Sequence, residues 1–180
     1  MLAAILINFC LFCAVIYNSS FLMQRSADFI NDITNFGDSP YGQLAKASLI
    51  AWYDYGFFTG VGVGQFRNIC PIIMLSYDVT YCDLHSHNIY LEVLSETGII
   101  GLGIFIMFVF YCLHSLVRAI IFTTDLQIIS LSSFSLASLF VVLLPFSITM
   151  SFFDNWAGVL NWFSISLSMS IIKLHSTRKY

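Results

Sequence analysis

The side chains best suited to chemistry gather in one short polar stretch, CDLHSHN at residues 82–88. It holds two of the chain's four histidines, and Glu92 and Glu96 follow it. A neutral imidazole can accept a proton from a hydroxyl group near neutral pH. His87 is therefore the candidate general base of this sequence.

Two other interpretations of the same stretch stay open. Polar residues collect naturally wherever a helix begins in solvent. The stretch also contains four metal-ligand types, namely Cys82, Asp83, His85 and His87. Their spacing matches no common zinc pattern, and histidines two residues apart suit a strand better than a helix. We therefore predict neither a metal site nor a cofactor.

A glycine-rich segment, GVGVG at residues 60–64, is the second feature of interest. No strand of a βαβ unit precedes it, so it is not a dinucleotide-binding motif. It is interpreted either as a flexible turn or as a place where the backbone approaches a substrate or another loop closely.

The composition indicates which elements must position these residues. Of 180 residues, 58% are hydrophobic and only 9% are charged, whereas soluble domains carry about 25% charged residues. Seven lysines and arginines, scattered along the chain, exclude a nucleic-acid partner. The sequence predicts an all-α integral membrane protein.

Apolar runs long enough to cross a membrane predict four transmembrane helices, at 1–17, 98–118, 128–150 and 156–172. The first run lacks the positive charge and small-residue cleavage site of a signal peptide, so we expect a retained span. Pro145 is expected to kink the third span.

Charge predicts how the spans are oriented. Arg118 and the basic tail at 173–180 fall on one side of the membrane, which the positive-inside rule assigns to the cytoplasm. Residues 18–97 then form a large outward-facing loop, and His87 would lie near the outer surface of the membrane. A small transporter is disfavoured because the spans carry almost no ionisable residue.

The loop contains two predicted helices. Asp38-Ser39-Pro40 is typical of an N-cap followed by proline, and apolar residues at helical spacing predict an amphipathic helix at 40–54 that ends at Gly56. A further helix is expected to start near His87 and to run unbroken into the span at 98–118.

Cysteines and serines suggest further contacts. Of five cysteines, Cys70 and Cys82 share the outer loop, where an oxidising compartment permits a disulfide; the sequence leaves open whether they pair, because the geometry is not readable from it. The last span carries four alternating serines, which point to a partner helix: Ser164, Ser166, Ser168 and Ser170.

Three segments together resemble one known family. They are GVGVGQF at 60–66, HSHNIYLE at 85–92 and ETGIIGL at 96–102. The combination is similar to the signature region of the O-antigen ligase and O-antigen polymerase superfamily, and the interval from His87 to Gly98 fits the family spacing.

The resemblance implies glycosyl transfer without a metal in a bacterial inner membrane, with the loop facing the periplasm. The donor would be a glycan on undecaprenyl diphosphate, and the acceptor a hydroxyl of lipid A–core or of another lipid-linked glycan. His87 would deprotonate or orient that hydroxyl. Arg67 and Lys46 are candidates to bind the diphosphate. The remaining candidate substrate-binding residues are Gly62, Gly64, Asn88 and Glu92.

The sequence also departs from the family. The start of the amphipathic helix, SPYGQ at 39–43, lacks the usual arginine, and four spans correspond to the C-terminal portion of the family. This leaves a second hypothesis, an inactive remnant or a non-catalytic membrane subunit, with a second chain supplying the missing helices. Ligase and polymerase share the motifs and are not separated by them.

Overall fold

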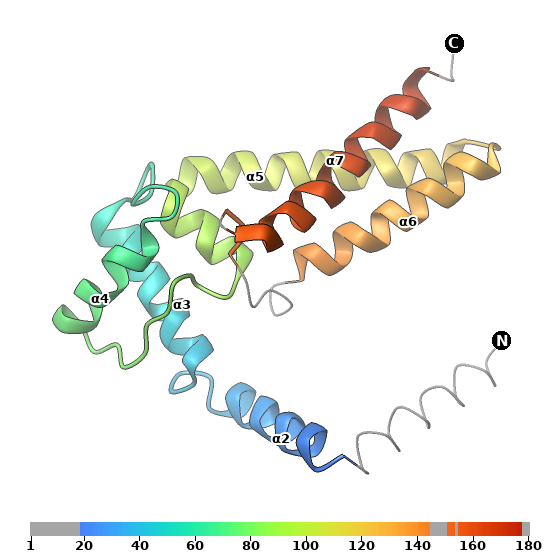
Figure 1. Cartoon of the computed structure of the whole chain (residues 1–180). Helices are drawn as coiled ribbons and strands as arrows, with labels where there is room; N and C mark the ends of the chain where they lie inside the picture. The colour runs from blue at the N-terminus through green and yellow to red at the C-terminus, as the bar shows by residue number, and fades with distance from the viewer. Residues whose placement is uncertain (1–18, 145–150, 154, 178–180) are drawn as a thin grey trace. The chain divides into compact units, whose positions relative to one another are not determined.

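The computed structural model describes residues 19–144, 151–153 and 155–177 (Figure 1). These residues form helices and connecting turns and include no strand, which confirms the all-α prediction for this part of the chain. The chain divides into two compact units, Met1–Gly42 and Gln43–Tyr180. The predicted span at 1–17 lies outside the described residues.

The first unit contains helix α2, Ser20–Thr34. Ser19 caps its start, because the Ser19 hydroxyl oxygen accepts a hydrogen bond from the Leu22 N–H at 3.3 Å. Several large apolar side chains of this helix are exposed: Phe21, Met23, Phe29, Ile30 and Ile33. We did not predict α2 from the sequence, although its apolar residues recur at helical spacing.

Helix α3, Pro40–Ile50, begins as the N-cap pattern predicts. The Ser39 hydroxyl oxygen accepts a hydrogen bond from the Gly42 N–H at 3.2 Å, and proline occupies the first helical position. The helix continues into a π-helical turn, η1, Ala51–Tyr55, and Gly56 ends it. The helix predicted at 40–54 is thus confirmed, with its last turn wider than expected.

Helix α4, Phe66–Ser76, was not predicted. It contains Pro71, a residue that normally signals the end of a helix. It packs against α3 and η1 around a small apolar core formed by Leu44, Ala47, Ala51, Phe66, Cys70, Ile73 and Val79. This core lies within the second unit and supports the segments on both sides of the glycine-rich segment.

Helix α5, Ile89–Phe122, is the longest element, and its course corrects one prediction. The helix predicted to run unbroken from His87 is interrupted at Gly98, where φ is 69° and ψ is −172°. Such backbone angles are accessible essentially to glycine alone. Figure 1 shows the resulting bend. We call residues 89–97 the first limb and residues 99–122 the second limb.

Helix α6, Leu126–Leu143, is shorter than the span predicted at 128–150. The Asp125 side chain caps its start by accepting from the Gln127 N–H at 2.9 Å. Leu144 is already extended, as a residue before proline prefers. The helix ends at Leu143, and the kink predicted at Pro145 lies outside the described residues.

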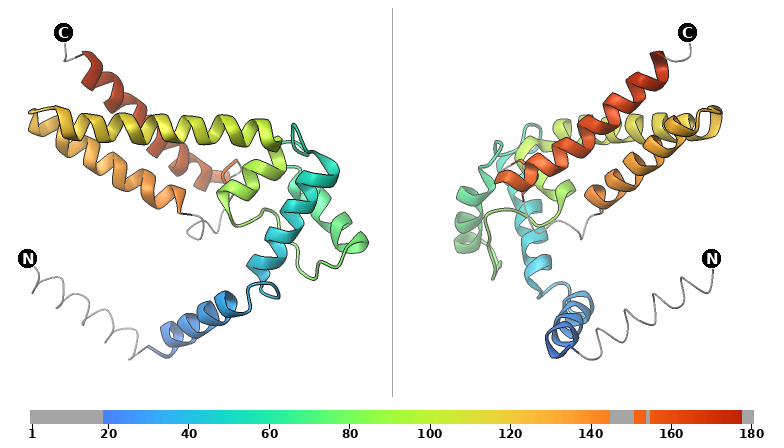
Figure 2. Two further views of the ribbon diagram at one scale, coloured as in Figure 1. Left: turned by 180° about the vertical axis from the view of Figure 1, so that it is seen from behind. Right: turned by 45° about the vertical axis from the view of Figure 1, so that its right-hand side comes forward.

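Helix α7, Asn155–Thr177, lies beside α5 and α6 (Figures 1 and 2). The three helices share a core of Ile89, Val93, Cys112, Leu116, Leu139, Leu143, Phe152, Ile165 and Ile171. The Ser135 and Ser168 hydroxyls are hydrogen-bonded at 2.7 Å, and so are Ser138 and Ser164 at 2.9 Å. These bonds identify α6 of the same chain as the partner of two of the four serines in the last predicted span, Ser164 and Ser168.

Two helices of the described part of the chain, α5 and α6, are long and apolar enough to cross a membrane. They correspond to the second and third predicted spans. The fourth predicted span, 156–172, falls within α7, whose alternating serines make it more polar.

Candidate functional site

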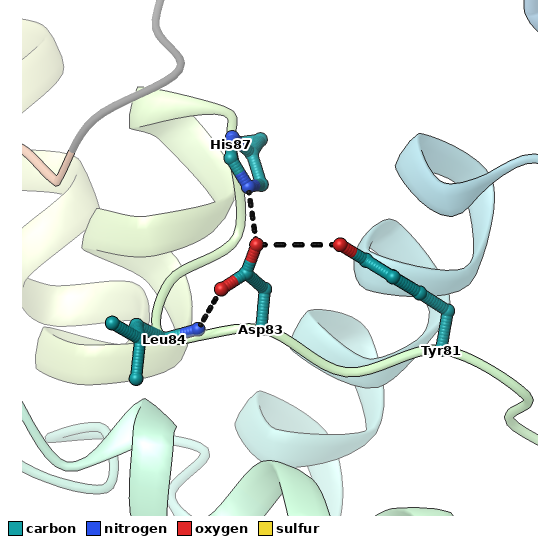
Figure 3. Close-up of polar contacts among 4 residues, drawn as sticks. All are labelled: Tyr81, Asp83, Leu84 and His87. Atoms are coloured by element: carbon teal, nitrogen blue, oxygen red, sulfur yellow. Dashed lines mark hydrogen bonds and ion pairs between the residues drawn. The ribbon is translucent and has the colours of Figure 1, made fainter.

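The candidate base His87 faces an acidic partner. Its Nε2 atom lies 3.0 Å from Oδ2 of Asp83 (Figure 3). The same carboxylate accepts a hydrogen bond from the Leu84 N–H at 2.6 Å and a longer one from the Tyr81 hydroxyl at 3.4 Å. Asp83 is therefore held in place from three directions, and it orients the imidazole.

The chain reaches this arrangement through an unusual turn before α5. His87 has φ of 53°, the left-handed region that side chains other than glycine rarely adopt. The turn is held on both sides, because the Ser86 hydroxyl donates to the Asn88 carbonyl at 3.0 Å and the Asn88 side chain caps α5 by accepting from the N–H groups of Tyr90 and Leu91. Strained backbone held in this way is common at functional sites.

The charge state of Asp83 determines the tautomer of His87. Burial alone would raise the pKa of the Asp83 carboxyl, but the hydrogen bonds from His87 and Leu84, together with the nearby imidazoles, outweigh it and lower the pKa below its ordinary value. An ionised carboxylate only accepts hydrogen bonds, so Nε2 of His87 carries the hydrogen. In the neutral ring, Nδ1 is then the basic nitrogen, and it is buried in this structure.

The neighbouring histidine is placed differently. The ring of His85 lies 4.4 Å from the ring of His87, centroid to centroid, at an interplanar angle of 42°. The Asp83 contact described above belongs to His87. His85 also helps to lower the pKa of the Asp83 carboxyl, so His85→Ala is the neighbouring substitution with which His87→Ala is compared.

The glycine-rich segment inserts its backbone into the break of α5. In an unbroken helix the carbonyls of residues 95–96 would accept from the N–H groups of residues 99–100. Instead, the N–H groups of residues 61–62 donate to those carbonyls at 2.9 and 3.0 Å, and residues 99–100 donate to the carbonyls of residues 57–58 at 3.0 and 3.3 Å. The segment is thus a close backbone contact, one of the two interpretations left open by the sequence.

This contact uses N–H groups of two predicted substrate-binding residues. The Gly62 N–H donates to the Glu96 carbonyl, and the Gly64 N–H donates to a Glu96 side-chain oxygen at 2.7 Å. Their assignment to substrate binding stays a prediction. Arg67 follows this segment as the second residue of α4 and is half-buried.

Lys46, Glu92 and Asn88, which were also predicted to bind substrate, have partners inside the protein; Asn88 caps α5, as described above. Nζ of Lys46 contacts the Asp78 carbonyl and lies 3.6 Å from its carboxylate. Glu92 is buried, and its oxygens accept from the Ser151 hydroxyl and from the Phe152 N–H, the latter at 2.9 Å. Glu92 therefore anchors the segment before α7 to the first limb of α5.

A disulfide joins Cys70 to Cys82, whose Cα atoms are 5.9 Å apart. It settles the pairing that the sequence left open, and it ties α4 to the segment that carries Asp83. It also removes the Cys82 sulfur from the set of potential metal ligands. Among the described residues, no group of three histidine, cysteine or acidic side chains could hold a metal ion.

The sequence of this chain is matched by one known family. A family model for O-antigen ligase matches residues 1–106 of this chain. The chain belongs to the O-antigen ligase family. The matched part of this family member includes the glycine-rich segment, His87 and Gly98, so the resemblance noted in the sequence is confirmed. The comparisons with curated proteins and with solved structures return no match.

Two contacts at the candidate site of this family member were not predicted from the sequence. Asp83 was counted only as a metal-ligand type, although it lies four residues before His87 and contacts it. Glu96 was quoted only as part of a motif. The separation of four residues between Asp83 and His87 could have indicated their contact. No local pattern indicated the contacts of Glu96, because its partners lie about thirty residues away.

Proposed function

We propose that this chain forms the His87-bearing part of a glycan ligase or polymerase. It would transfer a glycan from undecaprenyl diphosphate to a sugar hydroxyl, either of lipid A–core or of a growing lipid-linked glycan. Membership of the O-antigen ligase family supports the reaction class. The observation that carries the proposal is the 3.0 Å contact between His87 and Asp83.

In the proposed step His87 accepts the proton of the acceptor hydroxyl. The acceptor oxygen forms a new bond to the anomeric carbon of the donor glycan, while the bond between that carbon and the diphosphate oxygen breaks. Undecaprenyl diphosphate leaves with the bonding electrons. Asp83 stabilises the imidazolium that His87 becomes, as carboxylates do in related histidine–acid pairs.

The departing diphosphate needs a cation. Arg67 is the better candidate, because a guanidinium forms paired hydrogen bonds to phosphate oxygens. Lys46 is the weaker candidate, since it already contacts Asp78. Neither the proton transfer to His87 nor the departure of the diphosphate requires a metal or another cofactor.

We place the protein in the bacterial inner membrane, with residues 18–97 in the periplasm. The two apolar helices α5 and α6 support a membrane location. The Cys70–Cys82 disulfide supports an oxidising compartment for the loop. Membrane lipids, the lipid-linked glycan and the glycan acceptor are the expected partners.

The test is deletion of the gene in its host, followed by gel analysis of the lipopolysaccharide. Wild type, His87→Ala and His85→Ala are reintroduced at matched protein levels. We expect wild type and His85→Ala to restore the ladder and His87→Ala to fail. A His87→Ala protein that transfers glycan normally would refute the catalytic role.

The deletion phenotype also separates the candidate activities. Loss of all long chains from the core indicates a ligase, whereas a core carrying a single repeat unit indicates a polymerase. An unchanged ladder contradicts the proposal for the main surface glycan and favours the alternative, an inactive remnant or a non-catalytic membrane subunit.

A further inference from the structure

Glu96 connects two elements that are distant in sequence. Its side chain is buried, with 2% of the residue exposed. One carboxyl oxygen accepts from the Gly64 N–H at 2.7 Å, and the other accepts from the Phe66 N–H at 3.4 Å. Both carboxyl oxygens of Glu96 are therefore directed at the backbone that enters α4.

Helix α4 depends on this contact for its N-terminal cap. Its own N-cap residue, Gln65, makes no side-chain capping hydrogen bond. The first N–H groups of a helix have no partner within the helix and need one from elsewhere. Glu96, thirty residues away from Phe66, supplies it.

The position of Glu96 on α5 gives this cap a functional consequence. Glu96 lies near the end of the first limb, and the same limb begins two residues after His87. Arg67 follows Phe66 directly, so fixing the Phe66 N–H also fixes the backbone of Arg67. The first limb thus links the residue that would accept the proton to the cation that would hold the diphosphate.

We propose that Glu96 is a positioning residue, which holds the glycine-rich segment and the first turn of α4, and through them Arg67, in register with His87. The inference rests on the proposed function. The same contact occupies the N–H groups of Val61, Gly62, Gly64 and Phe66, which are bonded to Ser95 and Glu96.

The structural step can be tested without activity, by amide hydrogen exchange on the purified full chain in detergent. Glu96→Gln keeps the size of the side chain but replaces one accepting oxygen with an N–H₂ donor. We expect exchange at Gly64 and Phe66 to accelerate roughly tenfold or more, while amides of α6 stay unchanged. Glu96→Asp keeps the carboxylate on a shorter side chain, so its exchange rates at Gly64 and Phe66 should lie between those of wild type and those of Glu96→Gln. Unchanged exchange at Gly64 and Phe66 in both variants would overturn the inference.

The functional step is tested by kinetics in membrane vesicles with the lipid-linked glycan as donor. Glu96→Gln should raise the KM for the donor roughly tenfold or more, because small displacements of a positioning group are costly. The KM for the acceptor should stay the same. A donor KM equal to that of wild type would contradict the inference.

A double-variant comparison separates positioning from a general loss of stability. If Glu96 acts through Arg67, then Glu96→Gln adds little to the defect of Arg67→Ala. The matched control is Asp125→Asn, which alters a carboxylate that caps a different helix, α6, by accepting from the N–H groups of Gln127 and Ile128. Its effect should add fully to that of Arg67→Ala.

The outcomes distinguish the two proposals. Wild-type vesicles that transfer no glycan refute the proposed function, and the exchange experiment then still reports on the contact itself. If wild-type vesicles are active but the effects of Glu96→Gln and Arg67→Ala add in full, the positioning role of Glu96 is refuted and the proposed function is not.

Discussion

Gly98 and Phe58 approach so closely that no side chain fits between their backbones. A Cβ atom at Gly98 would lie 2.3 Å from the carbonyl carbon of Phe58. The contact exists because α5 opens at Gly98 and accepts the chain at residues 57–62. Glycine is therefore required here twice, once for the positive φ and once for the space.

Replacing Gly98 with alanine should destabilise the protein by about 1–3 kcal/mol or more, since both the backbone conformation and the packing oppose a side chain. Thermal unfolding in detergent would measure the loss. The control is Gly103→Ala in the second limb, where an added Cβ meets no atom within 4 Å and alanine favours the helix. Equal unfolding temperatures for the two variants would contradict the account of the break.

Asp83→Asn should lower activity by roughly 100-fold or more, because an amide no longer enforces the tautomer of His87. Glycan transfer by vesicles with matched protein levels is the measurement. A variant that retains most of its activity would show that His87 does not depend on Asp83.

The stability contribution of Asp83 should depend on pH in a defined direction. Its folded-state pKa lies below the ordinary value of 3.8, so its contribution is present above that value and disappears as the pH falls through the folded pKa. Because the side chain is 34% exposed, we expect about 0.2–1 kcal/mol at neutral pH. The difference in unfolding temperature between wild type and Asp83→Asn should therefore vanish in acid, and a difference that grows in acid would be inconsistent.

The Cys70–Cys82 disulfide should contribute about 2–4 kcal/mol, mainly by restricting the unfolded chain over a sequence separation of 12 residues. Reductant should lower the unfolding temperature of wild type to that of the Cys70→Ser, Cys82→Ser double variant. The double variant itself should not respond to reductant, because no disulfide then remains among the described residues, where Cys112 is buried and free. A change in the unfolding temperature of the double variant on adding reductant would show that reductant acts on the protein by another route than the Cys70–Cys82 disulfide.

Glu92→Ala should cost about 2–3 kcal/mol, because the Ser151 hydroxyl and the Phe152 N–H lose a buried acceptor. Glu92→Gln retains one accepting oxygen and should lose less. Chemical denaturation of both variants measures the difference, and equal losses would show that the carboxylate is not needed at this position.

Features carried by adjacent residues could be predicted from the sequence. Ser39 and Pro40 start α3 and Gly56 ends its continuation, because caps and glycine act on the backbone within a few residues. The apolar composition indicated the all-α class. His87 was identified as the candidate base from its residue type and surroundings.

Long-range relationships emerged only from the folded chain. The break at Gly98, the insertion of residues 57–62 into it and the capping of α4 by Glu96 join segments about thirty residues or more apart. Helical periodicity continues through Gly98, so the pattern alone predicts an unbroken helix. Whether a backbone hydrogen bond is made within a helix or with another segment depends on which segment packs beside it, and that is determined by tertiary structure.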